Sequence, residues 1–322
     1  MKRLVTMLDA PSSAPSAALA DRYRGAMLGL AAGNALGLPV EGFLRPYITR
    51  LHPGGVRDVA PEERTRSWDD DLAQAVVLAE AIVERDRFEI GDLAARFLAW
   101  RRENGRGIGH HTWRVLDAIE RGTPAEDAAR AVWIETGQNA AGNGAVMRCA
   151  PVALRWRSEP DRLIEETHQS ALVTHHDARC GWSAVAVNAA IAASLDGRAL
   201  ELEDLAASLD EAGAPLTVVE AVRAVAGSGL DALELDHDNT MGYTLKAMKA
   251  ALWALEQPGD FETIVMTVVN AGGDADTNGA VVGAALGAKH GVSAIPARWV
   301  ENIRGTDAIA ALADRLYRKS AG

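Results

Sequence analysis

Residues 272–286 read Gly-Gly-Asp-Ala-Asp-Thr-Asn-Gly-Ala-Val-Val-Gly-Ala-Ala-Leu. Two carboxylates, Asp274 and Asp276, and the hydroxyl of Thr277 stand on a glycine-rich turn, and the small apolar residues that follow have a helical pattern. Asp side chains at positions i and i+2, held by glycines that let the backbone turn tightly, can converge their oxygens on one hard cation such as Mg²⁺ or Ca²⁺. The stretch therefore predicts a cation site at the start of a helix.

A second acidic cluster, Asp69-Asp70-Asp71, immediately precedes the apolar helix pattern of residues 72–80. Helix capping and the helix dipole alone would favour acids here, by about 0.3–1 kcal/mol per charge. Three adjacent carboxylates repel one another, however, and a bound cation would relieve that repulsion. Taken alone, the cluster leaves both explanations open.

The rest of the chain predicts an all-α fold. Apolar residues recur at helical spacing in most long segments, and sustained period-two strand patterns are missing. The Gly residues at 25, 29, 33 and 37 recur every four residues, which indicates a ridge for close helix packing. No break between segments is long enough to be a domain linker, so acidic clusters about 200 residues apart can share a site only if the chain folds as one unit.

Composition narrows the class of protein. With 322 residues, 34.1 kDa and 48% hydrophobic residues, the chain can fill a sizeable core. Its net charge of −11 argues against duplex nucleic acid or an anionic membrane as the main partner. Two cysteines without a Cys-x-x-Cys pair, and no signal-peptide or transmembrane pattern, favour the cytoplasm. We expect a flexible N-terminal segment over residues 1–16 and one domain over residues 17–322.

Two familiar acidic motifs are excluded by their spacing. The run from Asp274 begins like an EF-hand loop, but its twelfth position is Ala285 where a bidentate Glu is required. A prenyl-transferring Asp-Asp-x-x-Asp motif would need an acid at Ala73 or Gln74. Neither motif explains the clusters.

What survives is a resemblance to the ADP-ribosylglycohydrolase family, which includes the dinitrogenase-reductase-activating glycohydrolase and the ADP-ribosylarginine and ADP-ribosylserine hydrolases. It extends from about Arg22 to Trp299. Segments at 24–29 and 33–41, Trp68-Asp69-Asp70-Asp71, 142–148, Thr174-His175 and 272–277 carry it, in the family's order. The resemblance implies a compact, single-domain helical fold. It also implies metal-dependent hydrolysis of the bond between ADP-ribose and a protein side chain, with arginine as the expected side chain.

The resemblance also implies a centre of two Mg²⁺ ions, with Mn²⁺ or Ca²⁺ as alternatives. Its ligands would be Asp69, Asp70, Asp71, Asp274, Asp276 and Thr277. Oxygen ligands of this kind select hard cations, and a metal pair can grip a ribose diol and a water together. The catalytic carboxylates would be Glu41, at the family's glutamate near the anomeric carbon, together with Asp71, Asp274 and Asp276.

Further positions match substrate-binding positions of the family. Gly142, Asn143 and Gly144 resemble the loop whose backbone amides approach the diphosphate, and His175 matches a histidine near the distal ribose. Tyr243 lies where relatives place an aromatic ring beside adenine, although core packing would explain it almost as well. Gly272 and Gly273 complete this set. The expected partner is an ADP-ribosylated protein or an ADP-ribose-containing small molecule.

The chain departs from the family pattern at two positions. Asp69 stands where the family has Thr or Ser, so five Asp carboxylates would face the four positive charges of two Mg²⁺ ions. Asn34 stands where Asp is common, which could alter a hydrogen bond behind the metal ligands. The alternatives left open are hydrolysis of ADP-ribosyl-serine, nucleic-acid ends or small ADP-ribose derivatives, and a non-enzymatic scaffold. The sequence identifies neither the modified target nor the transferase.

Overall fold

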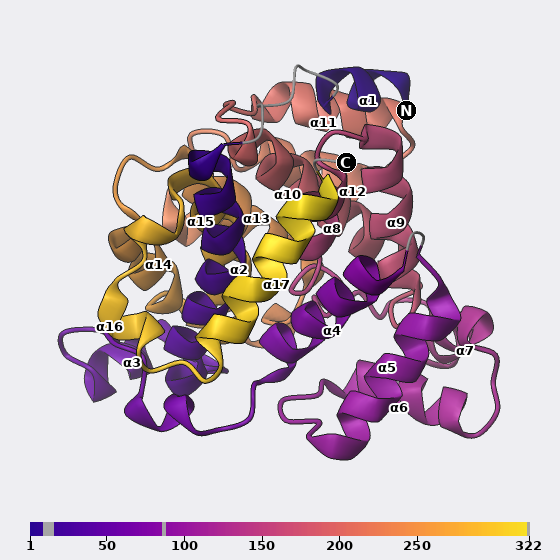
Figure 1. Cartoon of the computed structure of the whole chain (residues 1–322), viewed down its shortest axis with the longest axis horizontal. Helices are drawn as coiled ribbons and strands as arrows, with labels where there is room; N and C mark the ends of the chain where they lie inside the picture. The colour runs from indigo at the N-terminus through magenta and orange to yellow at the C-terminus, as the bar shows by residue number, and fades with distance from the viewer. Residues whose placement is uncertain (9–15, 86–87, 321–322) are drawn as a thin grey trace.

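The computed structural model describes residues 1–8, 16–85 and 88–320, and it is built mainly of α-helices (Figure 1). Their bounds are α1 Lys2–Leu8, α2 Ala17–Gly37, α3 Arg45–Leu51, α4 Asp70–Glu84, α5 Ile90–Glu103, α6 His110–Glu120, α7 Ala125–Glu135, α8 Ala150–Trp156, α9 Pro160–Leu172, α10 Ala178–Leu195, α11 Leu202–Glu211, α12 Leu216–Arg223, α13 Thr244–Glu256, α14 Phe261–Val269, α15 Ala275–His290, α16 Ala297–Val300 and α17 Thr306–Ser320. Short 3₁₀ turns connect some of them. The predicted all-α fold is confirmed.

Two very short strands are the exception among the described residues. The strands β1 (Phe43–Leu44) and β2 (Gly272–Gly273) pair antiparallel, with Phe43 opposite Gly273 and Leu44 opposite Gly272. Two-residue strands carry no period-two pattern, so sequence periodicity could not predict them. This small ribbon ties the segment after α2 to the turn that begins α15.

The helices α2 and α15 form the centre of the fold. They run antiparallel and side by side, and the glycines of one face those of the other: Gly25 with Gly287, Gly29 with Gly283, and Gly33 with Gly279. A Cβ atom added at Gly33 would overlap the carbonyl oxygen of Gly279, so the two backbones touch directly. The predicted packing ridge is therefore confirmed, and its partner is a second glycine ridge on α15.

This pairing brings the two acidic segments together. Because α2 and α15 run antiparallel, the last residue of α2, Gly37, packs against Ala275 and Asp276 at the start of α15. The start of α4 lies at the same end, since Asp71 in its first turn accepts a hydrogen bond from Asn34 near the end of α2. Helix α17, yellow in Figure 1, contacts α2, α4 and α8. The chain therefore folds as one unit around both acidic turns.

The N-terminus differs from the expected flexible segment. Residues Lys2–Leu8 form α1, which contacts α9, α10 and α11, with Leu4 and Leu8 buried. Arg3 pairs with Asp204 at 3.1 Å. Leu4 and Leu8 are buried in the core, and Val5 and Met7 pack against it. The remaining part of the expected segment falls mainly on residues 9–15, which lie outside the described residues.

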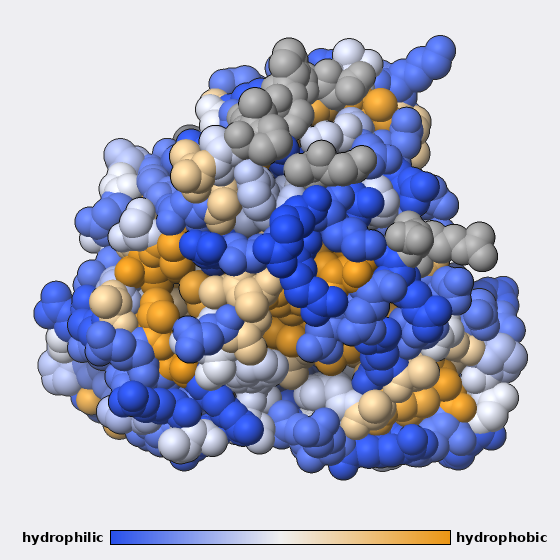
Figure 2. Space-filling model, in the orientation of Figure 1, coloured by the Kyte–Doolittle hydropathy of each residue, from blue (hydrophilic) through white to orange (hydrophobic). Residues whose placement is uncertain are grey.

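The surface is polar over most of the face seen in Figure 2, where apolar patches are separated by hydrophilic side chains. Within the described ranges, no helix combines the length and apolar character that crossing a bilayer requires.

Candidate metal centre

The second acidic turn is positioned by its backbone. Gly272 and Gly273 have φ angles of +82° and +74°, in the region that favours glycine, and both are buried. Asp274 follows as the N-cap of α15, and Asp276 and Thr277 occupy its first turn. The structure thus shows the two glycines forming the turn that directs these side chains inward. Their direct contact with substrate stays a prediction.

The first acidic turn has a similar local design. Asp69 is the N-cap of α4, and Asp70 and Asp71 lie in the first turn. All three residues are buried, and Asp71 is only 1% exposed. Acidic side chains at a helix start are favoured by the dipole, but burial of three of them demands a compensating positive charge.

The two turns converge on one cluster. Carboxylate oxygens of Asp69, Asp71 and Asp276 all lie within 4.8 Å of one another, and so do those of Glu41, Asp274 and Asp276. Asp276 belongs to both groups and joins them. Asp70 belongs to neither, and its carboxylate accepts a hydrogen bond from the backbone N–H of Gly109.

The electrostatics of the cluster fit a bound cation. Burial, followed by repulsion from neighbouring carboxylates, raises the pKa of Asp70, Asp71 and Asp276 well above the ordinary value. Burial also raises the pKa of Glu41 at the exposed rim, where Asp274 and Asp69 add to the effect. Among the described residues, Oδ1 of Asp71 and Oδ1 of Asp276 are buried without a hydrogen-bond donor. An all-oxygen set with unpaired inward oxygens suits a hard divalent cation.

Two further side chains support Asp71. Asn34, on α2, donates from Nδ2 to Asp71 Oδ2 at 3.4 Å, and Thr277 is also hydrogen-bonded to Asp71. The side-chain amide at position 34 therefore contacts the Asp71 carboxylate.

The predicted diphosphate loop lies beside the second acidic turn. Asn143 donates from Nδ2 to Asp274 Oδ2 at 2.8 Å, and its backbone N–H donates to the Gly242 carbonyl at 3.0 Å. Gly142 pairs with Tyr243 in an isolated antiparallel bridge. The loop is therefore fixed between the acidic cluster and the start of α13.

His175 lies beneath this loop. A Cβ atom added at Gly142 would lie 3.3 Å from His175 Nε2, and Thr174 Oγ1 is 2.8 Å from His175 Nδ1. Its ring packs against that of His111, with centroids 4.9 Å apart. Burial holds the pKa of His175 well below its usual range, so the ring is neutral at neutral pH. The contacts place this residue where it supports the glycine loop.

A pocket of 560 Å³ lies beside the loop. It is lined by Gly142, Tyr243 and Arg179 together with the residues of the 238–242 turn. Arg179 donates to the Tyr243 hydroxyl at 3.3 Å and is held by Asp177 at 2.8 Å. The pocket includes Gly242, where an added Cβ atom would lie 3.2 Å from Asp274 Oδ2, so the pocket adjoins the acidic cluster.

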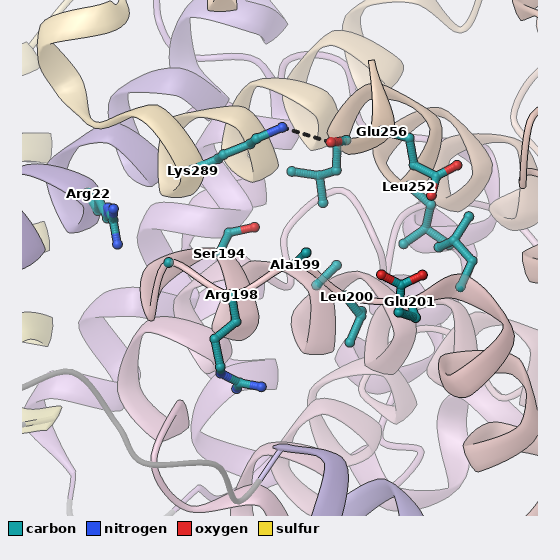
Figure 3. Close-up of a pocket in the computed structure, with 13 residues that line it drawn as sticks. Arg22, Ser194, Arg198, Ala199, Leu200, Glu201, Leu252, Glu256 and Lys289 are labelled. Atoms are coloured by element: carbon teal, nitrogen blue, oxygen red, sulfur yellow. Dashed lines mark hydrogen bonds between the residues drawn. The ribbon is translucent and has the colours of Figure 1, made fainter. Parts of the chain in front are cut away.

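A cavity of 430 Å³ at the far end of the α2–α15 pair is unrelated to this centre (Figure 3). Its cations bind helix ends: Arg22 donates to the Leu195 carbonyl at 2.9 Å, and Lys289 donates to the Leu255 carbonyl at 2.8 Å. Arg22 and Gly37 are separated by about 22 Å along α2, at 1.5 Å per residue. Helix capping therefore explains the positive charges of Arg22 and Lys289 in this cavity.

Comparison with known proteins assigns the fold and the centre to a family. The sequence profile of the ADP-ribosylglycohydrolase family matches residues 15–322. The chain belongs to the ADP-ribosylglycohydrolase family. A solved structure described as an ADP-ribosylglycohydrolase-related protein complex superposes with a TM-score of 0.75 at 31% identity, covering 94% of this chain and 99% of the other.

Relatives of the ADP-ribosylglycohydrolase family match over most of the chain. An uncharacterized protein of Archaeoglobus fulgidus is 32% identical, with 92% of this chain and 96% of that protein covered. The ADP-ribosylarginine hydrolase Tri1 of Pseudomonas putida is 27% identical, with 93% and 79% covered. The predicted family is confirmed, and the protein is a family hydrolase with a candidate acidic metal site. Identities at this level leave the substrate unresolved.

Three residues beside the candidate site were not predicted from the sequence. Arg106 and Gly107 lie against Asp69, and Arg179 lines the Tyr243 pocket. Arg106 and Gly107 lie in the Gly-Arg-Gly break before α6, which carries no motif and reads as an ordinary turn. The signal available for Arg106 was charge balance, because five clustered Asp residues call for a cation nearby. Arg179 follows the His175 motif by four residues and had no pattern of its own.

Proposed function

We propose that this ADP-ribosylglycohydrolase-family protein hydrolyses the glycosidic bond that joins ADP-ribose to an arginine side chain, using a divalent-cation centre. The proposal rests on two groups of carboxylates that share Asp276. Asn143 connects these carboxylates to the glycine loop, and the same loop lines the Tyr243 pocket. The name of the Pseudomonas putida relative supports arginine as the linkage.

The proposed centre holds two Mg²⁺ ions through Asp69, Asp71, Asp274, Asp276 and Thr277, with Asp70 as a ligand or supporting group. The carboxylate groups and their unpaired oxygens support this assignment. When bound, the ions supply positive charge and Lewis acidity at the ribose hydroxyls. Mn²⁺ would satisfy the same oxygen ligands, and Ca²⁺ would require a wider geometry.

The protein's own carboxylates would transfer the proton and orient the water. In this reaction water attacks the anomeric carbon of the distal ribose, the bond from that carbon to the guanidine nitrogen breaks, and the proton that the water gives up ends on the leaving nitrogen. Glu41 lies at the exposed rim beside Asp274 and is the group placed to transfer that proton. Asp71, Asp274 and Asp276 are the carboxylates available to orient the water.

The rest of ADP-ribose would extend from the cluster along the glycine loop. The 142–144 loop contacts Asp274 through Asn143 and Tyr243 through Gly142, and the diphosphate would lie along it. The adenine would stack on Tyr243, whose ring Arg179 holds in place. Because His175 packs beneath the loop, we propose that it acts by shaping the loop.

Cys149 and Cys180 are free and buried, which suits the reducing cytoplasm that we propose for the protein.

Peptides carrying ADP-ribosyl-arginine or ADP-ribosyl-serine test the proposal. Each is incubated with the protein in EDTA and in added Mg²⁺ or Mn²⁺, and free ADP-ribose is measured. The expected result is cation-dependent release from the arginine peptide, reduced at least about 1,000-fold in Asp276→Asn. The matched control Glu256→Gln, in the far cavity of Figure 3, should retain full activity.

Other outcomes separate the alternatives. Release from the serine peptide alone would replace the arginine linkage and keep the centre. Release from neither peptide, with cation binding intact, would favour nucleic-acid ends, small ADP-ribose derivatives or a scaffold role. Equal release in EDTA and in Mg²⁺ would contradict the cation centre itself.

A further inference from the structure

The two acidic turns together carry one Asp carboxylate more than two divalent cations can neutralise. Asp69, Asp70, Asp71, Asp274 and Asp276 gather five negative charges, and Glu41 adds a sixth at the rim. Asp69 is only 4% exposed, so water screens its charge poorly. A fixed positive charge close to Asp69 would offset this excess of negative charge.

Arg106 supplies that charge. Its Nε lies 3.8 Å from Asp69 Oδ1. The rest of the guanidinium is held in place, because Nη1 donates to Glu63 Oε2 at 2.9 Å and to the Ser67 carbonyl at 2.7 Å, and Nη2 donates to Glu63 Oε1 at 3.2 Å. A guanidinium fixed on one edge by three acceptors keeps the edge nearest Asp69 in position.

The loop that carries Arg106 closes tightly over the acidic turn. Gly107 has a φ angle of +76°, and a Cβ atom added there would overlap Asp69 Oδ1 and lie 2.8 Å from Asp70 Oδ1. Asn104 donates from Nδ2 to the Trp68 carbonyl at 2.9 Å, which ties the start of the same loop to the residue before Asp69. The loop is thus shaped to bring one arginine against one carboxylate.

We infer that Arg106 is a positioning residue for Asp69, and that its fixed charge stabilises the cation-free centre while lowering the affinity of the centre for divalent cations. The stabilisation and the lower cation affinity are linked, because the guanidinium and a bound cation both interact with the negative charge of Asp69. The inference rests on the proposed cation site and is independent of the linkage that the protein hydrolyses.

The chain offers a matched control for Arg106. Arg66 also binds Glu63, from Nη1 to Oε1 at 3.1 Å, and it has the same charge. Its exposed side chain makes no ion pair with Asp69 among those found in the described residues. Loss of Arg66 therefore reproduces the loss of a Glu63 partner without the loss of an Asp69 partner.

The test measures thermal unfolding in EDTA and calorimetric Mg²⁺ and Mn²⁺ titrations for the wild type, Arg106→Gln, Arg106→Lys and Arg66→Gln. Arg106→Gln should lower the Tm in EDTA by about 2–4 °C and bind cations about tenfold more tightly. Arg106→Lys, which keeps the charge, should recover most of both properties. Arg66→Gln should match the wild type in cation affinity.

Asp69→Asn provides the double-mutant cycle. In that background Arg106→Gln should change the cation affinity by less than about twofold, because the interaction with Asp69 is already lost. Equal effects of Arg106→Gln with and without Asp69 would overturn the inference, as would unchanged or weaker cation binding by Arg106→Gln. If the wild type bound no cation, the proposed cation site would fall together with the inference. Normal wild-type binding without coupling would remove the inference alone.

Discussion

The two acidic turns of the candidate metal centre begin helices in the same way but are held in place differently. The turn at 274–277 starts α15, whose backbone touches that of α2 along paired glycines such as Gly33 and Gly279. The turn at 69–71 starts α4 and is held by side chains and by the loop around Arg106. Backbone packing thus fixes one half of the centre, and charge balance fixes the other. Substitutions in the first half should therefore mainly lower the free energy of unfolding, and substitutions in the second should also change the cation affinity.

The largest expected effect is on the half that backbone packing holds. Gly33→Ala places a methyl group against the Gly279 carbonyl, and we expect a loss of about 2–4 kcal/mol in the free energy of unfolding, measured with urea. Gly91→Ala in α5 is the control, because its added Cβ would meet nothing within 4 Å. That control should be neutral or slightly stabilising. Equal stability of the two variants would contradict direct backbone contact between α2 and α15.

The shared charge of both turns predicts a pH dependence that the cation removes. The pKa values of Asp70, Asp71 and Asp276 are raised in the folded protein without a cation. Their protonated forms therefore contribute stability that is fully present below the ordinary Asp pKa and is lost as the pH rises through the raised values. The difference in Tm between Mg²⁺ and EDTA should therefore widen as the pH rises above the ordinary Asp pKa. A difference that stays constant with pH would contradict the repulsion.

A smaller effect is expected at the loop over the first turn. Gly107→Ala combines a positive φ angle with an overlap on Asp69, whereas Gly137→Ala has a φ angle of +79° and open space. Both should lose about 1 kcal/mol to backbone strain. Only Gly107→Ala should also weaken Mg²⁺ binding, by about tenfold, because it displaces Asp69. Similar Mg²⁺ affinities in calorimetry would show that the loop does not position this carboxylate.

The smallest expected effect is at Asn34, which reaches from α2 to the first turn. Asn34→Asp replaces the donor to Asp71 by another negative charge. We expect a loss of about 1 kcal/mol in EDTA and a cation affinity a few times tighter. Urea unfolding with and without Mg²⁺ measures both. A gain of stability in EDTA would mean that position 34 does not repel the cluster.

The sequence predicted the half held by the backbone better than the half held by charge. The ridge of Gly25, Gly29 and Gly33 and the turn at Asp274 are local patterns, and both were recognised. The sequence alone does not pair this ridge with the matching ridge on α15, because helix pairing depends on the whole fold. The distance from Arg106 to Asp69 is likewise a tertiary property, set by a loop whose sequence reads as a break.

Asp276 tests most directly whether the two turns form one centre, because its carboxylate belongs to both groups. Calorimetric titration of Mn²⁺ into EDTA-treated, dialysed protein should show saturable binding of two ions by the wild type. In Asp276→Asn, folded by circular dichroism, both binding steps should weaken by about 100-fold or more. Retention of one step at wild-type affinity would show two independent acidic turns and would contradict a single shared centre.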